Sequence, residues 1–193
     1  MLNLPKNYQR VKSLPDDPVG SSSFMSQTER SLNFVMQFPI SLEEAMSYNS
    51  DEIINDIHSC LADNQGLIEV NKGETKNNNL YIYSIVKTLK EPSGVQYTIT
   101  MHIIDENSAT AIQGFFDETG ITGERDTAVF AHCMSNNMVS FDDMSNWTKD
   151  PYDDNYKKGA LMNYSEKAEF DEAFLEHPLS QARILIAEVI KNN

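Results

Sequence analysis

The chain has 193 residues, with 15 Lys and Arg against 29 Asp and Glu, and a formal net charge of −14. This length suits one domain with a sizeable core, so we expect a single domain over 1–193. The negative charge argues against nucleic acid or an anionic membrane as partner. No apolar run approaches the roughly 20 residues that cross a bilayer. The first ten residues lack an apolar signal core, which predicts a cytoplasmic protein.

The N-terminal part is expected to form an arm and a hairpin. Residues 1–20 are polar and proline-containing, which indicates an extended arm with one short strand over Tyr8–Val11. Apolar residues alternate with other residues from Leu32 to Phe38, a period of two that predicts a strand. This strand is expected to pair with Ser22–Gln27 as a hairpin. Pro39 has no amide donor and is expected to end it.

The next element is predicted to be a helix. Asn49 stands three residues before Glu52, the spacing of a capping box. Gly66 is expected to end the helical region and begin a strand. Between Asn49 and Gly66, apolar side chains share one helical face at Ile53, Ile54, Ile57, Cys60 and Leu61.

Four strands follow in quick succession, at Leu67–Lys72, Leu80–Leu89, Val95–Ile104 and Ala109–Asp117. Their connectors are short and rich in turn-forming residues, so neighbouring strands are expected to be antiparallel, as a meander. Neither face of the third strand is fully polar. The sheet is therefore expected to be covered, at least partly, on both sides.

The C-terminal third is predicted to be helical around an irregular loop. One helix is expected over 123–136, with Thr122 as its cap. Another begins at Asn163, three residues before Glu166, and a last one begins near Pro178. The pattern predicts an α+β fold with an antiparallel sheet flanked by helices. Its parts are an N-terminal arm over 1–20, a core over 21–138, and a loop with C-terminal helices over 139–193.

The cysteines and histidines give no sign of a cofactor or of a metal centre. Cys60 and Cys133 are expected to be free thiols buried beside apolar residues, with a single disulfide as the alternative. The four histidines lack the i, i+4 spacing of a helical zinc site, and there is no Cys-x-x-Cys. We expect no cofactor and no metal.

Two segments concentrate polar residues. Gly114–Asp126 joins a strand to a helix start; it either cradles an anion with the help of Arg125 or is a turn in which Arg125 is ion-paired. It contains no dinucleotide or P-loop motif. Asp150–Tyr156 places several oxygen ligands close together, as calcium sites do, but lacks the EF-hand spacing. The alternative is a loop pinned to the core by its tyrosines.

The order of elements resembles the PsbP-like α/β/α sandwich of a photosystem extrinsic subunit and of a small Ran-binding protein. This resemblance spans about 22–138 and implies a binding module more than an enzyme. Five stretches are also similar to a bacterial family without an established activity, so this second resemblance supplies no catalytic residues. They are Asp17–Phe24, Tyr83–Thr88, Gly114–Asp126, Asp150–Asp153 and His177–Ser180.

Two classes of function are compatible with the sequence. The first is a non-enzymatic interaction module, because no nucleophile, metal or phosphate signature is assembled. The second is a small hydrolase or transferase that uses Asp117, Glu118 and His102, if these converge near one sheet edge. A cleft that holds all three would favour the enzyme.

A basic protein is the expected partner of an interaction module. Residues 142–176 hold ten acids and four lysines, interleaved with aromatic residues, which is typical of an interface. One version of this hypothesis is the neutralisation of a basic toxin; the alternative is that the aromatics only pin a solvated loop. The oligomeric state is left open. The candidate binding residues are Trp147, Asp150, Tyr152, Asp153, Asp154 and Tyr156.

Overall fold

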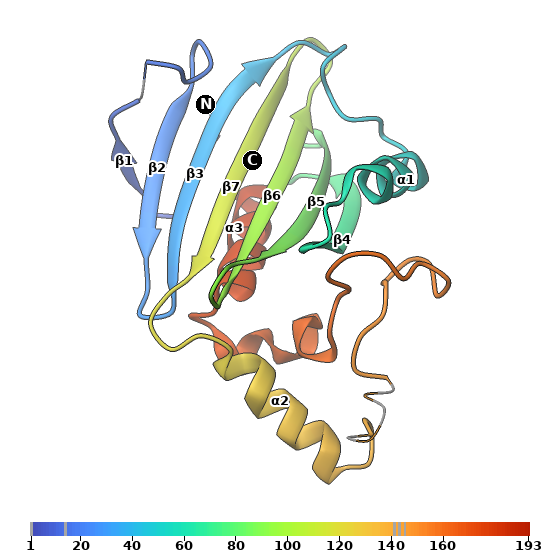
Figure 1. Ribbon diagram of the computed structural model, residues 1–193. Coiled ribbons are helices and arrows are strands. Elements are labelled where there is room, and N and C mark those ends of the chain that lie inside the picture. The colour runs from blue at the N-terminus through green and yellow to red at the C-terminus, as the bar shows by residue number, and fades with distance from the viewer. Residues whose placement is uncertain (1, 14, 141, 143, 145) are drawn as a thin grey trace.

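The computed structural model describes residues 2–13, 15–140, 142, 144 and 146–193. Within them, one antiparallel sheet has the strand order β1-β2-β3-β7-β6-β5-β4 (Figure 1). The fold is α+β, as predicted, and none of the helices in these residues has the length and apolar character to cross a membrane. The strands are β1 (Gln9–Val11), β2 (Ser22–Gln27), β3 (Ser31–Ile40), β4 (Gln65–Glu74), β5 (Leu80–Leu89), β6 (Val95–Ile104) and β7 (Ala109–Glu118). The helices are α1 (Ser50–Cys60), α2 (Glu124–Ser135), the 3₁₀ turns η1 (Tyr164–Glu166) and η2 (Ala168–Phe174), and α3 (Pro178–Asn192).

The predicted hairpin and meander are both present, and they join through β3 and β7. These strands pair from Ser31 opposite Glu118 to Ile40 opposite Ala109. The prediction that Pro39 ends its strand is wrong, because Pro39 lies inside β3 opposite Thr110. β2 pairs with β3 only as far as Gln37. Pro39 therefore has a strand neighbour on one side only, the edge-like position in which proline is tolerated.

One face of the sheet is covered by α3, which lies behind the strands in Figure 1. Leu179, Ala182, Leu185, Ile186 and Val189 of α3 are buried in one cluster with apolar residues of five strands. The N-terminal arm packs on the same cluster through Leu2, Leu4 and Tyr8. The prediction of a sheet flanked by helices is confirmed on this face.

The second face is covered in part. Ile53 of α1 packs on Leu67 and Val70 of β4 and Ile82 of β5. Among the described residues, α1 is the helix that packs on this face, and it lies over the β4 and β5 end (Figure 1). The side of the sheet that faces the viewer over β2, β3 and β7 carries no helix in Figure 1.

Several predicted boundaries are wrong for local reasons. The segment expected to be a helix from Asn163 is instead two 3₁₀ turns, although its capping box with Glu166 is present. Gly123 in a left-handed conformation, and not Thr122, occupies the cap of α2. Gly66 lies inside β4, where a Cβ would overlap the Ala160 carbonyl oxygen, so close backbone approach requires glycine there.

Candidate functional site

Asp150, predicted as a surface binding residue, is buried. One of its carboxylate oxygens lies 2.9 Å from His58 Nε2, at the end of α1. The other accepts from the amides of Tyr152 and Asp153, at 2.9 Å each. Both carboxylate oxygens of Asp150 therefore have partners, and these contacts shape the loop and tie it to α1.

The two tyrosines of this loop also bind the body of the protein. The Tyr152 hydroxyl bridges both backbone groups of Val70 on the edge strand β4, accepting from its amide at 2.6 Å and donating to its carbonyl at 3.1 Å. The Tyr156 ring stacks on His58 with centroids 4.0 Å apart, and its hydroxyl donates to the His58 carbonyl. The loop thereby covers part of the β4 edge, which would otherwise present unpaired backbone groups.

Trp147 packs its ring edge-on against Phe130 of α2, with centroids 4.9 Å apart. Asp153 and Asp154 are exposed, and 41% of Tyr152 is exposed. Of the six candidate binding residues, these three are exposed, Trp147 and Tyr156 are half-buried, and Asp150 is buried. No group of three or more metal-ligating side chains occurs among the residues that the structure describes, Asp150–Tyr156 included.

The three candidate catalytic residues do not converge. Asp117 and Glu118 are consecutive in β7, so their side chains lie on opposite faces of the sheet. Asp117 pairs with Gln96 in register, whereas His102 lies six residues further along β6, or about 20 Å at 3.3 Å per residue. Their partners differ as well: Asp117 binds Lys90, Glu118 accepts from the Gly123 amide, and His102 Nδ1 accepts from the Met46 amide at 2.8 Å.

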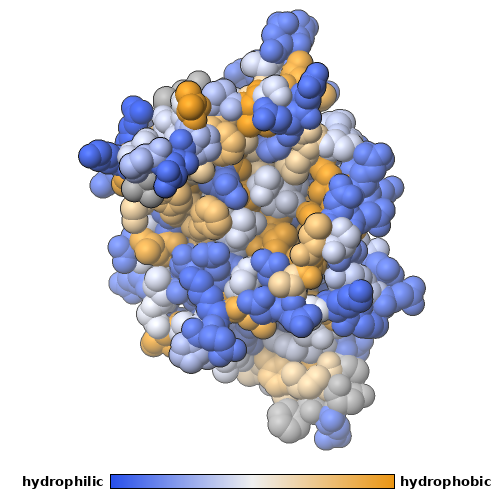
Figure 2. All heavy atoms as spheres, turned by 45° about the horizontal axis from the view of Figure 1, so that its top comes forward, coloured by the Kyte–Doolittle hydropathy of each residue, from blue (hydrophilic) through white to orange (hydrophobic). Residues whose placement is uncertain are grey.

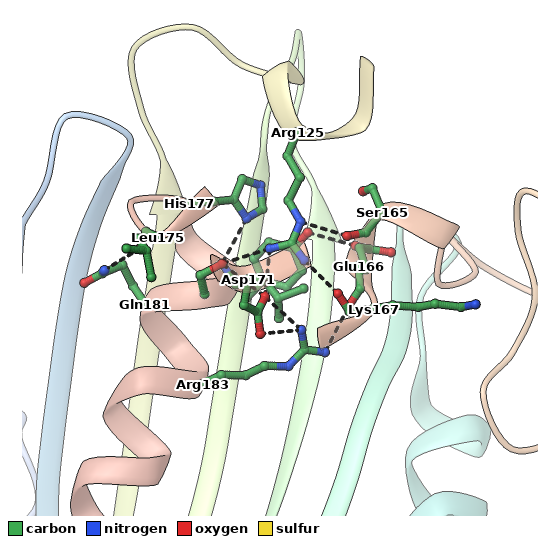
Figure 3. Close-up of polar contacts among 12 residues, drawn as sticks. Arg125, Ser165, Glu166, Lys167, Asp171, Leu175, His177, Gln181 and Arg183 are labelled. Carbon is green, nitrogen blue, oxygen red and sulfur yellow. Dashed lines mark hydrogen bonds and ion pairs between the residues drawn. The ribbon is translucent and has the colours of Figure 1, made fainter. Parts of the chain in front are cut away.

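Gly114–Asp126 is the turn with an ion-paired arginine and not an anion cradle. Burial raises the pKa of Glu118. Its carboxylate accepts a hydrogen bond from the Gly123 amide at the start of α2. Arg125 is 1% exposed, and its guanidinium binds the Ser165 and Lys167 carbonyls, Asp171 and Ser180 (Figure 3). The arginine therefore fastens α2 to η1, η2 and α3.

Asp171 receives a second guanidinium, that of Arg183 from α3 (Figure 3). Arg183 also binds Glu69 of β4 at 2.9 Å and the Glu166 carbonyl. A further buried pair, Lys87 with Glu166 at 2.7 Å, lies in the same layer. These contacts satisfy each other and hold the C-terminal helices on the sheet.

The prediction of two buried thiols is half right. Cys133 of α2 is fully buried, which raises the pKa of its thiol. Cys60 is exposed because it is the last residue of α1, beyond the part of the helix that packs on β4. Both cysteines are free, as expected.

The buried side of β3 holds Val35 and three polar residues, whereas its more apolar side is only half-buried. Ser31, Asn33 and Gln37 are at most 2% exposed and lie on the face covered by α3 and the N-terminal arm. Asn33 is satisfied there by Ser31 and Ser26. Leu32, Phe34, Met36 and Phe38 alternate with them and are only half-buried, on the other face.

Cross-strand neighbours extend this apolar row. Phe34 lies opposite Phe115 of β7 and Met25 of β2 in register, so all three share a face. The Phe34 and Phe115 rings are 6.5 Å apart, and Met25 is 37% exposed. Figure 2, which views this side obliquely, shows apolar side chains in several groups, with white and hydrophilic residues between and around them. We call the set Met25, Leu32, Phe34, Met36, Phe38 and Phe115 the open face.

The open face is bordered by an acidic segment. Residues 41–71, which run from the end of β3 through α1 into β4, hold seven acids and no Lys or Arg. Glu43, Asp51 and Asp56 are exposed along it. Between α1 and the sheet is a hollow of about 300 Å³, lined by Met46, Asp56 and Thr100 among others. The His102–Met46 hydrogen bond holds this border to β6.

No protein-family model and no curated protein matches this sequence. Among solved structures, the chain is similar to the solution structure of cyanobacterial PsbP (CyanoP) from Synechocystis sp. PCC 6803. The two share 11% identity and a TM-score of 0.38 over 68% of this chain and 81% of that chain. This distant likeness carries no functional argument, and the α+β class rests on the strand order and packing described above.

Proposed function

We propose that this chain is a non-enzymatic protein-interaction module of the cytoplasm that binds a basic protein partner on its open face. The observation that carries the proposal is the inverted burial of β3, which buries Asn33 and Gln37 while Phe34 and Phe38 remain half-exposed. A basic toxin is one partner of this kind.

The apolar side chains of the open face favour protein contact. Contiguous apolar patches with a polar border are typical of interaction sites on the surface of a monomer. Phenylalanine and methionine are enriched at interface cores, and the open face supplies three phenylalanines and two methionines. A partner segment that covers them removes this apolar area from water, at about 25 cal/mol per Å².

The acidic border favours a basic partner. Exposed carboxylates beside an apolar patch attract complementary charge and speed the encounter more than they add affinity. Asp153 and Asp154 add to this field beyond the C-terminal end of α1, because Asp150 ties their loop to His58. A partner with an apolar row and flanking Lys or Arg fits both features.

The proposal is tested by affinity capture with paired variants. Phe34→Ser with Phe115→Ser removes the centre of the open face. Leu175→Ser is the matched control, because Leu175 is 55% exposed in η2's C-terminal cap, away from this face. A specific partner is expected to be captured by the wild type and the control and to be lost with the double variant. Equal capture by all three proteins would refute the open face as the docking surface.

The charge of the partner is tested separately. Glu43→Lys with Asp56→Lys reverses two exposed border charges, and Glu172→Lys with Glu176→Lys reverses two exposed charges on η2 and the residues after it. Capture is expected to weaken only with the first pair, and to fall as salt shortens the Debye length from about 8 Å at physiological ionic strength. If the amount of captured partner changed neither with the charge reversal nor with the salt concentration, a basic partner would be excluded.

A further inference from the structure

A hollow separate from the open face lies between the segments 146–151 and 162–167. Its volume is about 380 Å³, within the range of roughly 300–1,000 Å³ that small-molecule sites occupy. Its lining includes Trp147, Pro151, Met162 and Tyr164, which are apolar or aromatic, together with Lys149 and Lys167.

The walls of this hollow are fixed by backbone contacts. Thr148 and Asn163 form an antiparallel bridge. On either side of it, the Lys149 amide donates to the Met162 carbonyl at 2.9 Å and the Tyr164 amide donates to the Trp147 carbonyl at 2.8 Å. Trp147 is further held by its edge-on contact with Phe130. The site is thus preformed, so a ligand need not order it.

The charge of the hollow is opposite to that of the chain. Among the residues that the structure describes, its lining holds two lysines and no carboxylate, in a protein of net charge −14. Among the described residues, neither ammonium has a carboxylate partner, and Lys167 Nζ instead lies 3.5 Å from the centroid of the Tyr164 ring. Two cations beside an aromatic and aliphatic surface fit an anion with an apolar body.

We propose that this hollow binds a small organic anion, a carboxylate whose apolar or aromatic body lies against Trp147 and Met162 and whose charged group meets Lys149 and Lys167. The apolar body gains from leaving water, and the ammonium groups donate charge-assisted hydrogen bonds to the carboxylate. The hollow shares no residue with the open face, so this proposal can be tested independently of the partner proposed above.

The test uses octanoate, below its micellar concentration, as the anionic probe and octanamide as its neutral equivalent. Binding is measured by titration calorimetry, and emission of Trp147, the one tryptophan of the chain, shows whether the probe occupies this hollow. We expect saturable octanoate binding with a change in Trp147 emission. Octanamide is expected to bind about tenfold more weakly, because it lacks the charge-assisted hydrogen bonds.

The lysines are tested with a matched pair of variants. Lys149→Gln with Lys167→Gln is expected to raise the octanoate Kd about tenfold or more. Lys157→Gln with Lys158→Gln, which removes two exposed charges outside the lining, is expected to leave the Kd within about twofold. Equal binding of octanoate and octanamide, octanoate binding without a Trp147 response, the absence of saturable binding, or an equal effect of both pairs would each overturn the proposal.

Discussion

The rings of Phe34 and Phe115 lie 6.5 Å apart on neighbouring strands, on the face of the sheet opposite α3. One residue along β7, Phe116 is fully buried beneath α3. The same strand therefore presents one phenylalanine to the core and one to a surface that is only half-covered. This contrast separates residues kept for stability from residues available to a partner.

The contrast predicts different costs of truncation. Phe116→Ala is expected to destabilise the protein by about 3–5 kcal/mol, because it removes a buried ring and leaves a cavity. Phe34→Ala is expected to cost about 1 kcal/mol, because its ring is already partly in water. Urea unfolding of the two variants measures both values. A loss at Phe34 as large as that at Phe116 would show that the open face is part of the core.

The period of two in residues 32–38 was sufficient to predict the strand but not which of its faces is buried. Hydrophobicity alone would place Phe34 inside and Asn33 outside. The reverse holds because the buried side of β3 is set by α3 and the N-terminal arm, and because Ser26 and Ser31 satisfy Asn33 there. These partners become neighbours only through the tertiary fold.

The loop 150–156 shows the same limit. Its composition singles out aromatic and acidic residues but does not predict which of them are buried. Asp150 lies inside because His58, 92 positions away in the sequence, meets its carboxylate. Strand ends, by contrast, depend on residues a few positions apart, which is why most strand boundaries could be predicted to within two residues.

The Tyr152 hydroxyl predicts a local effect on the edge of the sheet. Tyr152→Phe removes the group that bridges the amide and carbonyl of Val70 while it keeps the ring. One neutral hydrogen bond contributes about 1 kcal/mol, so the Val70 amide is expected to exchange with solvent about fivefold faster. Hydrogen exchange followed by NMR measures this rate. Unchanged exchange at Val70 would show that the loop does not protect β4.

The buried pair of Lys87 and Glu166 predicts strong coupling. Both side chains are at most 4% exposed, and Glu166 also accepts from the Tyr97 hydroxyl. Lys87→Met or Glu166→Gln alone is expected to cost about 3 kcal/mol, because each leaves a buried charge without its partner. The double variant is expected to cost clearly less than the sum, in a cycle measured by urea unfolding.

A surface pair provides the control for that cycle. Lys90 pairs with Asp117, but 42% of its side chain is exposed. Lys90→Met is therefore expected to cost less than about 1 kcal/mol. Additive costs for Lys87 and Glu166, or a cost at Lys90 equal to that at Lys87, would contradict the assignment of a buried ion pair.

His177 predicts how stability changes with pH. Its side chain caps α3, with Nδ1 accepting from the Leu179 amide, and it is 7% exposed. Burial, followed by the nearby charges of Arg125 and Arg183, lowers the pKa of His177 from 6.5 to about 3. The folded protein therefore keeps this histidine neutral at pH values where the unfolded chain binds a proton. Its contribution to stability is complete above pH 6.5 and is lost as the pH falls towards 3.

The test compares wild type with His177→Asn in thermal or urea unfolding between pH 7 and pH 4. Asparagine keeps a cap acceptor for the Leu179 amide but does not titrate. Carboxylates titrate alike in both proteins, so the difference between the two curves isolates His177. Wild type is expected to lose about 1.4 kcal/mol per pH unit more than the variant below pH 6.5. Parallel curves would mean that the folded protein accepts the proton on His177 without cost, contrary to its burial beside two arginines.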